Sequence, residues 1–318
     1  MRDLIVATLN AYSDTLFDNV LEHNALLNRL KAGSNTTLLD GGDEIEEDLM
    51  YAENSTFKWY SGFELLEVTA NPVLTAAKFA WKQANANVVI SGEEIRKNAD
   101  SKTRKHNLLK ARISVCEKTM QNKIGASLFS DGTGSSGKEL TGLQALISDN
   151  PSTGVVGGID RAAYPFWRNQ VYSFNAEQGI SVGTLPTGQE FIQGLDELVL
   201  RCTRGTDTPQ MIVMDKVYFS IYKTYLQSIK RITVDVKGDA GFKTLEYEGT
   251  PVFFDPYVPT QHAYTLNLDY LFFKAHKDAN FKLDSERLPY NQDAEVYPML
   301  FMGNLTMGNA NLQGVLKS

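Results

Sequence analysis

The segment Gly132-Thr133-Gly134-Ser135-Ser136-Gly137-Lys138 has residue types and a spacing that could do chemistry. It fits the phosphate-loop pattern of a glycine, four residues, a second glycine and a lysine, in which backbone N–H groups cradle phosphate. Two features argue against a nucleotide site. Glu139 stands where the motif needs a Ser or Thr hydroxyl for Mg²⁺, and the loop follows a predicted helix instead of a buried strand. A flexible connector between a helix and the next domain is the better interpretation.

Other catalytic patterns are absent from the sequence. It contains no G-x-S-x-G elbow and no H-E-x-x-H pair. The histidines are too scattered to predict a metal cluster: His23, His106, His262 and His276. Carboxylates are plentiful, but no spacing favours an acid/base pair. We therefore expect no catalytic, cofactor-binding or metal-binding residues, and no enzymatic activity.

The bulk properties indicate a folded protein without a membrane span. A chain of 318 residues can form two lobes around separate cores, and the net charge of -7 argues against a dedicated nucleic-acid binder. No secretory signal is visible. The uncharged run Val296–Leu316 contains Pro298 and Gly303, so it predicts sheet and turns. Cys116 and Cys202 are expected to be small buried residues; a disulfide or metal pair is the alternative.

The first ninety residues divide into three expected elements. An apolar stripe predicts an amphipathic helix over residues 5–30, ended by Gly33. The acidic run 40–53 is interpreted as a loop, with either a solvated face or a docking surface for a basic neighbour. Residues 56–90 look like an extended hairpin whose aromatic residues need a partner surface, although residues 72–86 have helical spacing.

A long helix is predicted over residues 92–129. Ser91 and Glu94 form a capping box at its start. Its second half has one apolar stripe from Leu109 to Leu128. Its first half is strongly basic, which suits either nucleic-acid phosphates or an acidic neighbouring subunit.

The region 140–250 has the pattern of a compact mixed domain. Thr187 and Glu190 form a second capping box, Met211–Met214 reads as a buried strand, and Asp215 can cap the following helix. Strands and turns are expected for most of the last seventy residues.

The segment Gly157–Asn169, with its glycine pair, Asp160-Arg161 and Tyr164-Pro165-Phe166-Trp167, resembles a signature run of tailed-bacteriophage major capsid proteins with the Hong Kong 97-like fold. Further strings that resemble this family occur in the family's order along nearly the whole chain: Tyr51–Asn54, Tyr60–Gly62, Trp81–Ala84, Ser130–Gly134, Gly142–Leu146, Gly303–Thr306 and Leu312–Leu316.

The resemblance implies an α+β capsid fold with five regions in sequence order. They are an N-terminal arm (1–55), an extended loop (56–90), a spine helix and connector (91–139), an axial domain (140–250) and a return to the peripheral sheet (251–318). In the signature segment, we expect Tyr164, Phe166 and Trp167 to enter the core of the axial domain and Arg161 and Arg168 to lie near its rim.

The resemblance also implies a function. The chain would form hexamers and pentamers that close into an icosahedral head shell, assembled in the host bacterial cytoplasm, around double-stranded DNA contacted non-specifically. Separate scaffolding, portal and decoration proteins are possible partners; because the sequence starts at the expected arm, any scaffold would be a separate protein. The alternatives are an encapsulin-like nanocompartment shell and a phosphate-loop enzyme. We expect that deletion of residues 56–90 leaves a foldable core but abolishes shells.

Overall fold

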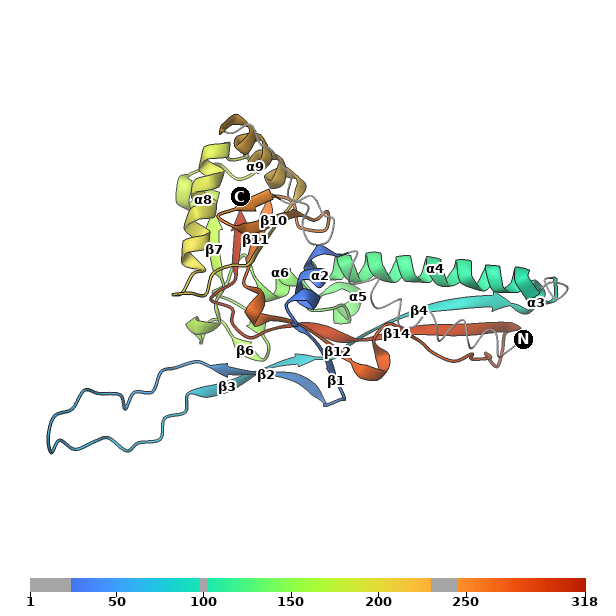
Figure 1. The fold of residues 1–318 in the computed structure, drawn as a ribbon, viewed down its shortest axis with the longest axis horizontal. Helices are drawn as coiled ribbons and strands as arrows, with labels where there is room; N and C mark the ends of the chain where they lie inside the picture. The colour runs from blue at the N-terminus through green and yellow to red at the C-terminus, as the bar shows by residue number, and fades with distance from the viewer. Residues whose placement is uncertain (1–23, 98–101, 230–244) are drawn as a thin grey trace.

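The computed structural model describes residues 24–97, 102–229 and 245–318. The described chain is elongated (Figure 1): helix α4 runs along a long sheet, a lobe carrying α8 and α9 stands beside that sheet, and a thin hairpin projects at the opposite end. Helices and sheets are both present, as the α+β prediction requires. In the parts of the chain that the structure describes, no helix combines the length and apolar character needed to cross a bilayer.

A five-stranded sheet lies along the long axis. Its strands are β1 (Thr36–Leu39), β12 (Leu271–His276), β14 (Ala294–Met307), β13 (Lys282–Leu283) and β4 (Lys82–Ser91). The first ten residues of β14 pair antiparallel with β4 and its last five pair antiparallel with β12. The uncharged run Val296–Leu316 is therefore strand β14, a turn and strand β15, as predicted.

Two helices follow β4, which are α3 (Gly92–Lys97) and α4 (Lys102–Ser127). The capping box is confirmed, because the Ser91 N–H donates to the Glu94 carboxylate (3.2 Å) and the Glu94 N–H donates to the Ser91 hydroxyl (3.3 Å). The apolar stripe is confirmed as well, since the five residues Leu109, Ile113, Cys116, Met120 and Ile124 are buried in the same core as Val88 and Ile90 of β4. At 26 residues, α4 is about 39 Å long. Residues 98–101, within the predicted single helix, lie outside the described residues.

A six-stranded sheet forms the second lobe. Its strands in spatial order are β7 (Gln170–Ser173), β15 (Gly314–Lys317), β11 (His262–Leu266), β8 (Met211–Met214), β10 (Thr250–Phe254) and β9 (Leu245–Tyr247). All four β8 residues are buried, which confirms the predicted inner strand.

Two amphipathic helices pack on this sheet, α8 (Gly188–Arg201) and α9 (Lys216–Ile229). Both predicted caps are present: Thr187 and Glu190 bond reciprocally, and the Tyr218 N–H donates to the Asp215 carboxylate at 2.9 Å. Near the N-terminus, Asn24 caps α2 (Ala25–Ala32), and this helix ends at Gly33 as predicted. The rest of the helix predicted over residues 5–30 lies outside the described residues.

Shorter elements connect these parts. They are α5 (Gly134–Gly137), α6 (Leu143–Leu146), α7 (Phe174–Gln178), β5 (Val155–Val156), β6 (Ile159–Asp160) and the 3₁₀ turns Pro165–Trp167, Leu268–Tyr270 and Lys277–Ala279.

The hairpin is built from two strands that the sequence assigned otherwise. β2 (Glu44–Met50) pairs antiparallel with β3 (Leu74–Ala80) over seven residues. The prediction of a loop over 40–53 was wrong, because Ile45, Glu47 and Leu49 alternate with exposed neighbours at the two-residue period of a strand. The helical spacing over 72–86 was also misleading, since pairing with distant β2 and β14 decides the conformation of β3 and β4.

The predicted limits of the extended loop and of the last region need correction. The hairpin spans residues 44–80, whereas β4 leaves it and pairs with β14. The boundary at residue 250 does not follow the sheets, because β10, β11 and β15 belong to the six-stranded sheet and the return to the five-stranded sheet is confined to β12, β13 and β14. Deletion of residues 56–90 would remove β4 and its buried Val88 and Ile90, so it would not leave a foldable core.

Candidate assembly surfaces

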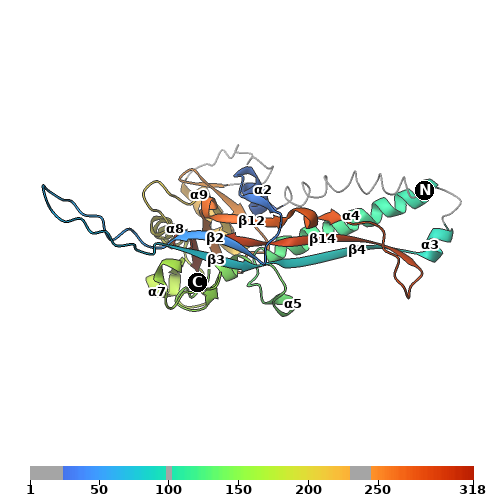
Figure 2. The same cartoon turned by 90° about the horizontal axis from the view of Figure 1, so that it is seen from below.

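The end of the hairpin, residues 51–73, carries large apolar side chains that its own chain leaves exposed. Figure 2 shows this loop extending alone from the body. Trp59 is 90% exposed, Phe63 107% and Val68 100%. Phe57, Tyr60, Leu65 and Leu66 are exposed as well, as expected from the aromatic content of this stretch. Large apolar side chains that are exposed together in one segment are typical of an interaction site.

A nearly buried ion pair joins the root of the hairpin to the five-stranded sheet. The Lys274 ammonium on β12 lies 2.7 Å from a carboxylate oxygen of Glu47 on β2, with side chains 14% and 10% exposed. The Thr306 hydroxyl on β14 donates to the same carboxylate oxygen. Because all three residues lie on strands, this contact helps set the angle at which the hairpin leaves the body.

Gly157 forms a second contact between the hairpin and the body. The Lys78 N–H on β3 donates to the Gly157 carbonyl at 2.9 Å. Gly157 has φ +59°, and a Cβ atom there would lie 2.9 Å from the Ala77 Cβ and 3.1 Å from the Phe79 ring. This position therefore needs glycine both for its left-handed backbone and for the close approach of β3.

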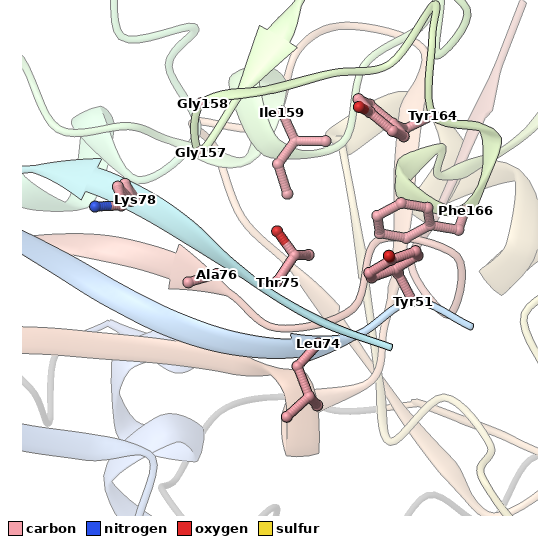
Figure 3. A pocket seen from close by; sticks show the side chains of 10 residues that line it. All are labelled: Tyr51, Leu74, Thr75, Ala76, Lys78, Gly157, Gly158, Ile159, Tyr164 and Phe166. Carbon is pink, nitrogen blue, oxygen red and sulfur yellow. The ribbon is translucent and has the colours of Figure 1, made fainter. Parts of the chain in front are cut away.

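An open cleft of about 450 Å³ lies between the hairpin root and the 157–166 segment. Figure 3 shows Tyr51, the residue after β2, with its ring against Phe166; the ring centroids are 5.7 Å apart. Tyr164 and Lys78 line the same cleft. The signature segment thus supplies one wall of the hairpin root.

The deeper residues of the signature segment hold the fold together. Trp167 is 1% exposed and its indole N–H donates to the Val156 carbonyl at 2.9 Å. Its partly buried neighbour Phe166 packs against the same core, while Tyr164 is half exposed. This core contains Met211 and Val213 of β8 as well as residues of the five-stranded sheet, and it is distinct from the core under α8 and α9. The expected burial is therefore found for Trp167 and was wrong for Tyr164.

Arg161 also departs from its expected position at the rim. It is 1% exposed, donates to the Leu146 carbonyl, and burial lowers the pKa of its guanidinium to about 10. Arg168 is half-buried and bonds to the Arg161 carbonyl at 2.7 Å. Arg161 was misplaced because sequence alone gives no sign that a charged side chain next to an aspartate will point inward.

The residues that suggested chemistry do not come together. The 132–138 loop follows helix α4 instead of a strand, as expected, and Ser135 and Ser136 have positive φ angles. His262 pairs with Asp149 at 3.0 Å, and His276 accepts from the Asp278 N–H. Across residues 24–97, 102–229 and 245–318, no group of three potential metal ligands is found. His23 and the side chain of His106 lie outside the described residues.

Comparisons with known proteins identify the fold of the described chain. No protein-family model matches the sequence, and no curated protein matches it. Solved structures match over most of the chain. The cyanophage A-1(L) capsid superposes with a TM-score of 0.61 over 91% of this chain and 92% of that chain, at 16% identity. The chain has the Hong Kong 97-like capsid fold.

Other solved structures agree with this capsid fold. The capsid of the native GTA particle has a TM-score of 0.58 at 14% identity, covering 91% of this chain and 89% of that chain. The SrpI encapsulin of Synechococcus elongatus has a TM-score of 0.57 at 11% identity, covering 89% and 84%. The capsid fold predicted from the resemblance is therefore confirmed.

Proposed function

We propose that this chain is the structural subunit of a closed protein shell, the major capsid protein of a tailed bacteriophage. The observation that carries the proposal is the exposed apolar end of the hairpin, with Trp59, Phe63 and Val68 at least nine-tenths exposed. A single chain gains nothing from such a surface, whereas burial on a neighbour contributes about 25 cal/mol per Å² of apolar area. The capsid fold and the elongated form of the chain support the same conclusion.

In this proposal the chain forms hexamers and pentamers of an icosahedral head that encloses double-stranded DNA, with no enzymatic role. The five regions keep the order arm, extended loop, spine, axial and peripheral. The axial domain is taken as the six-stranded sheet with α8 and α9, and the peripheral domain as the five-stranded sheet with α4. Scaffolding, portal and decoration proteins are proposed partners. The proposed location is the head shell, which is assembled in the host cytoplasm.

The second candidate is an encapsulin-like compartment, which the similarity to the SrpI encapsulin favours. It needs the same shell contacts and differs in contents, since it predicts closed particles without packaged DNA. The third candidate, a phosphate-loop enzyme, is disfavoured because Glu139 follows Lys138 and its carboxylate lies against Gly134 inside the loop.

The test is electron microscopy of the purified recombinant protein beside a variant in which residues 55–71 are replaced by a short glycine-containing turn. This deletion keeps β2, β3 and β4, which the fold needs. We expect closed particles from the intact chain, and folded but unassembled subunits from the variant. Particles of normal size from the variant, or a small oligomer of the intact chain that turns over nucleotide, would overturn the proposal. DNA inside particles recovered from infected cells separates the phage shell from the compartment.

A further inference from the structure

The charges of this chain are strongly separated along its sequence. Residues 43–80, which are the hairpin and the residue before it, contain eight carboxylates and two lysines. Residues 82–138, which form β4, the helices α3 and α4 and the loop behind them, contain eleven Lys and Arg against five Asp and Glu. Residues 43–80 thus carry a formal charge of -6 and the spine region +6, in a chain whose net charge is -7. Opposite charges favour contact between the hairpin of one chain and the spine region of another.

Three lysines from three separate elements meet around one pocket of the spine region. Lys82 begins β4, Lys123 lies near the end of α4, and Lys138 ends the 132–138 loop. The pocket has a volume of about 340 Å³, and Ile124, Leu140 and Phe301 are among its apolar lining residues. Within the described ranges, none of the three ammonium groups forms an ion pair, and Lys82 donates to the Gly137 carbonyl. The pocket thus combines apolar lining with three lysines against one carboxylate, that of Glu139.

The end of the hairpin has the complementary chemistry. Glu64 and Glu67 alternate there with Phe63, Leu65 and Leu66, and all five side chains are exposed. Neither carboxylate has an ion-pair partner among the described residues. An apolar segment with two carboxylates matches an apolar pocket with three ammonium groups, because burial of the apolar groups strengthens each charge contact.

A chain cannot make this contact with itself. Residues 63–67 are separated from Lys82 by the whole length of the β3 arm, roughly 50 Å at about 3.3 Å per extended residue. The hairpin points away from α5 and the start of β4 in both views (Figures 1 and 2). The occupant of the pocket must therefore come from another molecule.

We propose that the pocket of Lys82, Lys123 and Lys138 is a carboxylate-binding site, and that its ligand is the 63–67 segment of a second copy of this chain. The contact is head-to-tail, so each copy offers one segment and one pocket, which is the type of interface that closes into rings. The inference rests on the proposed shell function, because it names the receptor for the exposed hairpin end.

Nucleic-acid phosphate is the other anion that three lysines could bind. The pocket favours a carboxylate segment, because its lining includes Ile124, Leu140 and Phe301. A phosphate backbone has no apolar groups to cover these side chains, whereas Phe63, Leu65 and Leu66 flank the two carboxylates of the hairpin end.

The first experiment measures binding without requiring assembly. A labelled synthetic peptide with the sequence of residues 60–70 is titrated into the unassembled subunit that lacks residues 55–71, and fluorescence anisotropy follows binding at low and high salt. We expect saturable binding that weakens at least about tenfold when Lys123→Glu and Lys138→Glu are combined, and that weakens as salt increases. The control combines Lys216→Glu and Lys223→Glu, two exposed lysines of α9, and should bind as the parent does. Equal binding by all three proteins, or binding of a DNA oligonucleotide with no binding of the peptide, would overturn the inference.

A charge exchange in the full chain tests the contact within particles. Glu64→Lys with Glu67→Lys, and separately Lys123→Glu with Lys138→Glu, should each reduce the rate of particle formation by about tenfold in light scattering. The chain with all four substitutions should recover to within about threefold of the parent, because residues 64 and 67 again oppose residues 123 and 138 in charge and only Lys82 faces a like charge. If the parent forms particles and both charge-reversed double variants form them at the same rate, the pocket assignment is refuted and the shell function is not. A parent chain that forms no particles would instead refute the shell function, and the peptide titration would still decide the pocket.

Discussion

The Lys274 ammonium lies 2.7 Å from the carboxylate of Glu47, and this pair joins the first strand of the hairpin to the five-stranded sheet. Both side chains are nearly buried, and the Thr306 hydroxyl bonds the same carboxylate. An ionised pair in this position contributes little net stability compared with a well-packed apolar pair, but loss of one partner leaves a buried charge uncompensated. The pair therefore matters for where the hairpin points.

Glu47→Leu should lower the free energy of unfolding of the unassembled subunit by about 3 kcal/mol, because Lys274 then remains buried without its carboxylate. The double variant Glu47→Leu/Lys274→Met should recover at least half of that loss. Glu46→Gln is the matched control: Glu46 pairs with Lys78 at 2.8 Å in an exposed contact, so its loss should stay within about 1 kcal/mol. Urea unfolding measures all three, and a cost for Glu47→Leu no larger than that of Glu46→Gln would contradict the prediction.

Gly157→Ala should loosen the hairpin root. The substitution adds the cost of a left-handed residue, about 1–2 kcal/mol, and a Cβ atom 2.9 Å from the Ala77 Cβ. Gly158→Ala is the control, since it shares a positive φ (+74°) but has no atom within 4 Å of the added Cβ. Hydrogen exchange of the Lys78 amide, which donates to the Gly157 carbonyl, should accelerate in the first variant and not in the second. Equal exchange in both would show that the close approach is unimportant.

The ion pair of His262 and Asp149 should make stability depend on pH. Burial lowers the pKa of His262, but its hydrogen bonds to Asp149 and to the Thr260 carbonyl, together with the charge of Asp149, outweigh this, so that the pKa lies above its usual value. Burial raises the pKa of Asp149, but the hydrogen bond to His262 and the positive charges of His262 and Lys317 together outweigh this, so that the pKa lies below its usual value. The contribution of His262 is therefore complete below about pH 6.5 and is lost as pH rises through its folded pKa; that of Asp149 is lost as pH falls through its folded pKa.

His262→Gln should consequently cost roughly 1 kcal/mol more at pH 5.5 than at pH 9. Chemical unfolding of parent and variant at the two pH values provides the measurement. A difference between the proteins that is the same at both pH values would mean that protonation of His262 does not stabilise the contact with Asp149.

Both cysteines should be unreactive in the folded protein. Cys202 is fully buried and Cys116 is 7% exposed, and burial raises the pKa of their thiols to about 12 and about 11. At pH 8 a thiol with a pKa of about 11 is ionised in roughly one molecule in a thousand. Ellman's reagent should therefore label neither thiol rapidly until the chain is unfolded in guanidinium, when both should react. Prompt labelling of the native Cys116→Ala variant would contradict the assignment for Cys202.

The sequence by itself determined many of the local elements and, through the resemblance, the overall fold. The caps at Ser91, Thr187 and Asp215, the buried strand Met211–Met214 and the apolar stripe of α4 follow from short-range spacing, and each is present. The caps and the stripe depend on residues three or four positions apart, and the strand is a continuous apolar run, so each can be recognised within a short stretch of sequence. The ordered strings that resemble capsid proteins led to the fold that the solved structures support.

Tertiary structure alone decided the features that depend on distant partners. β2 and β3 became strands because they pair with each other across the 51–73 loop, against the acidic composition of one and the helical spacing of the other. Arg161 is buried with its guanidinium donating to the carbonyl of Leu146, a partner that the fold supplies from the preceding helix α6. The meeting of Lys82, Lys123 and Lys138 is invisible in the sequence for the same reason: they lie on a strand, a helix and a loop, and only the packing of these elements brings the three positive charges together.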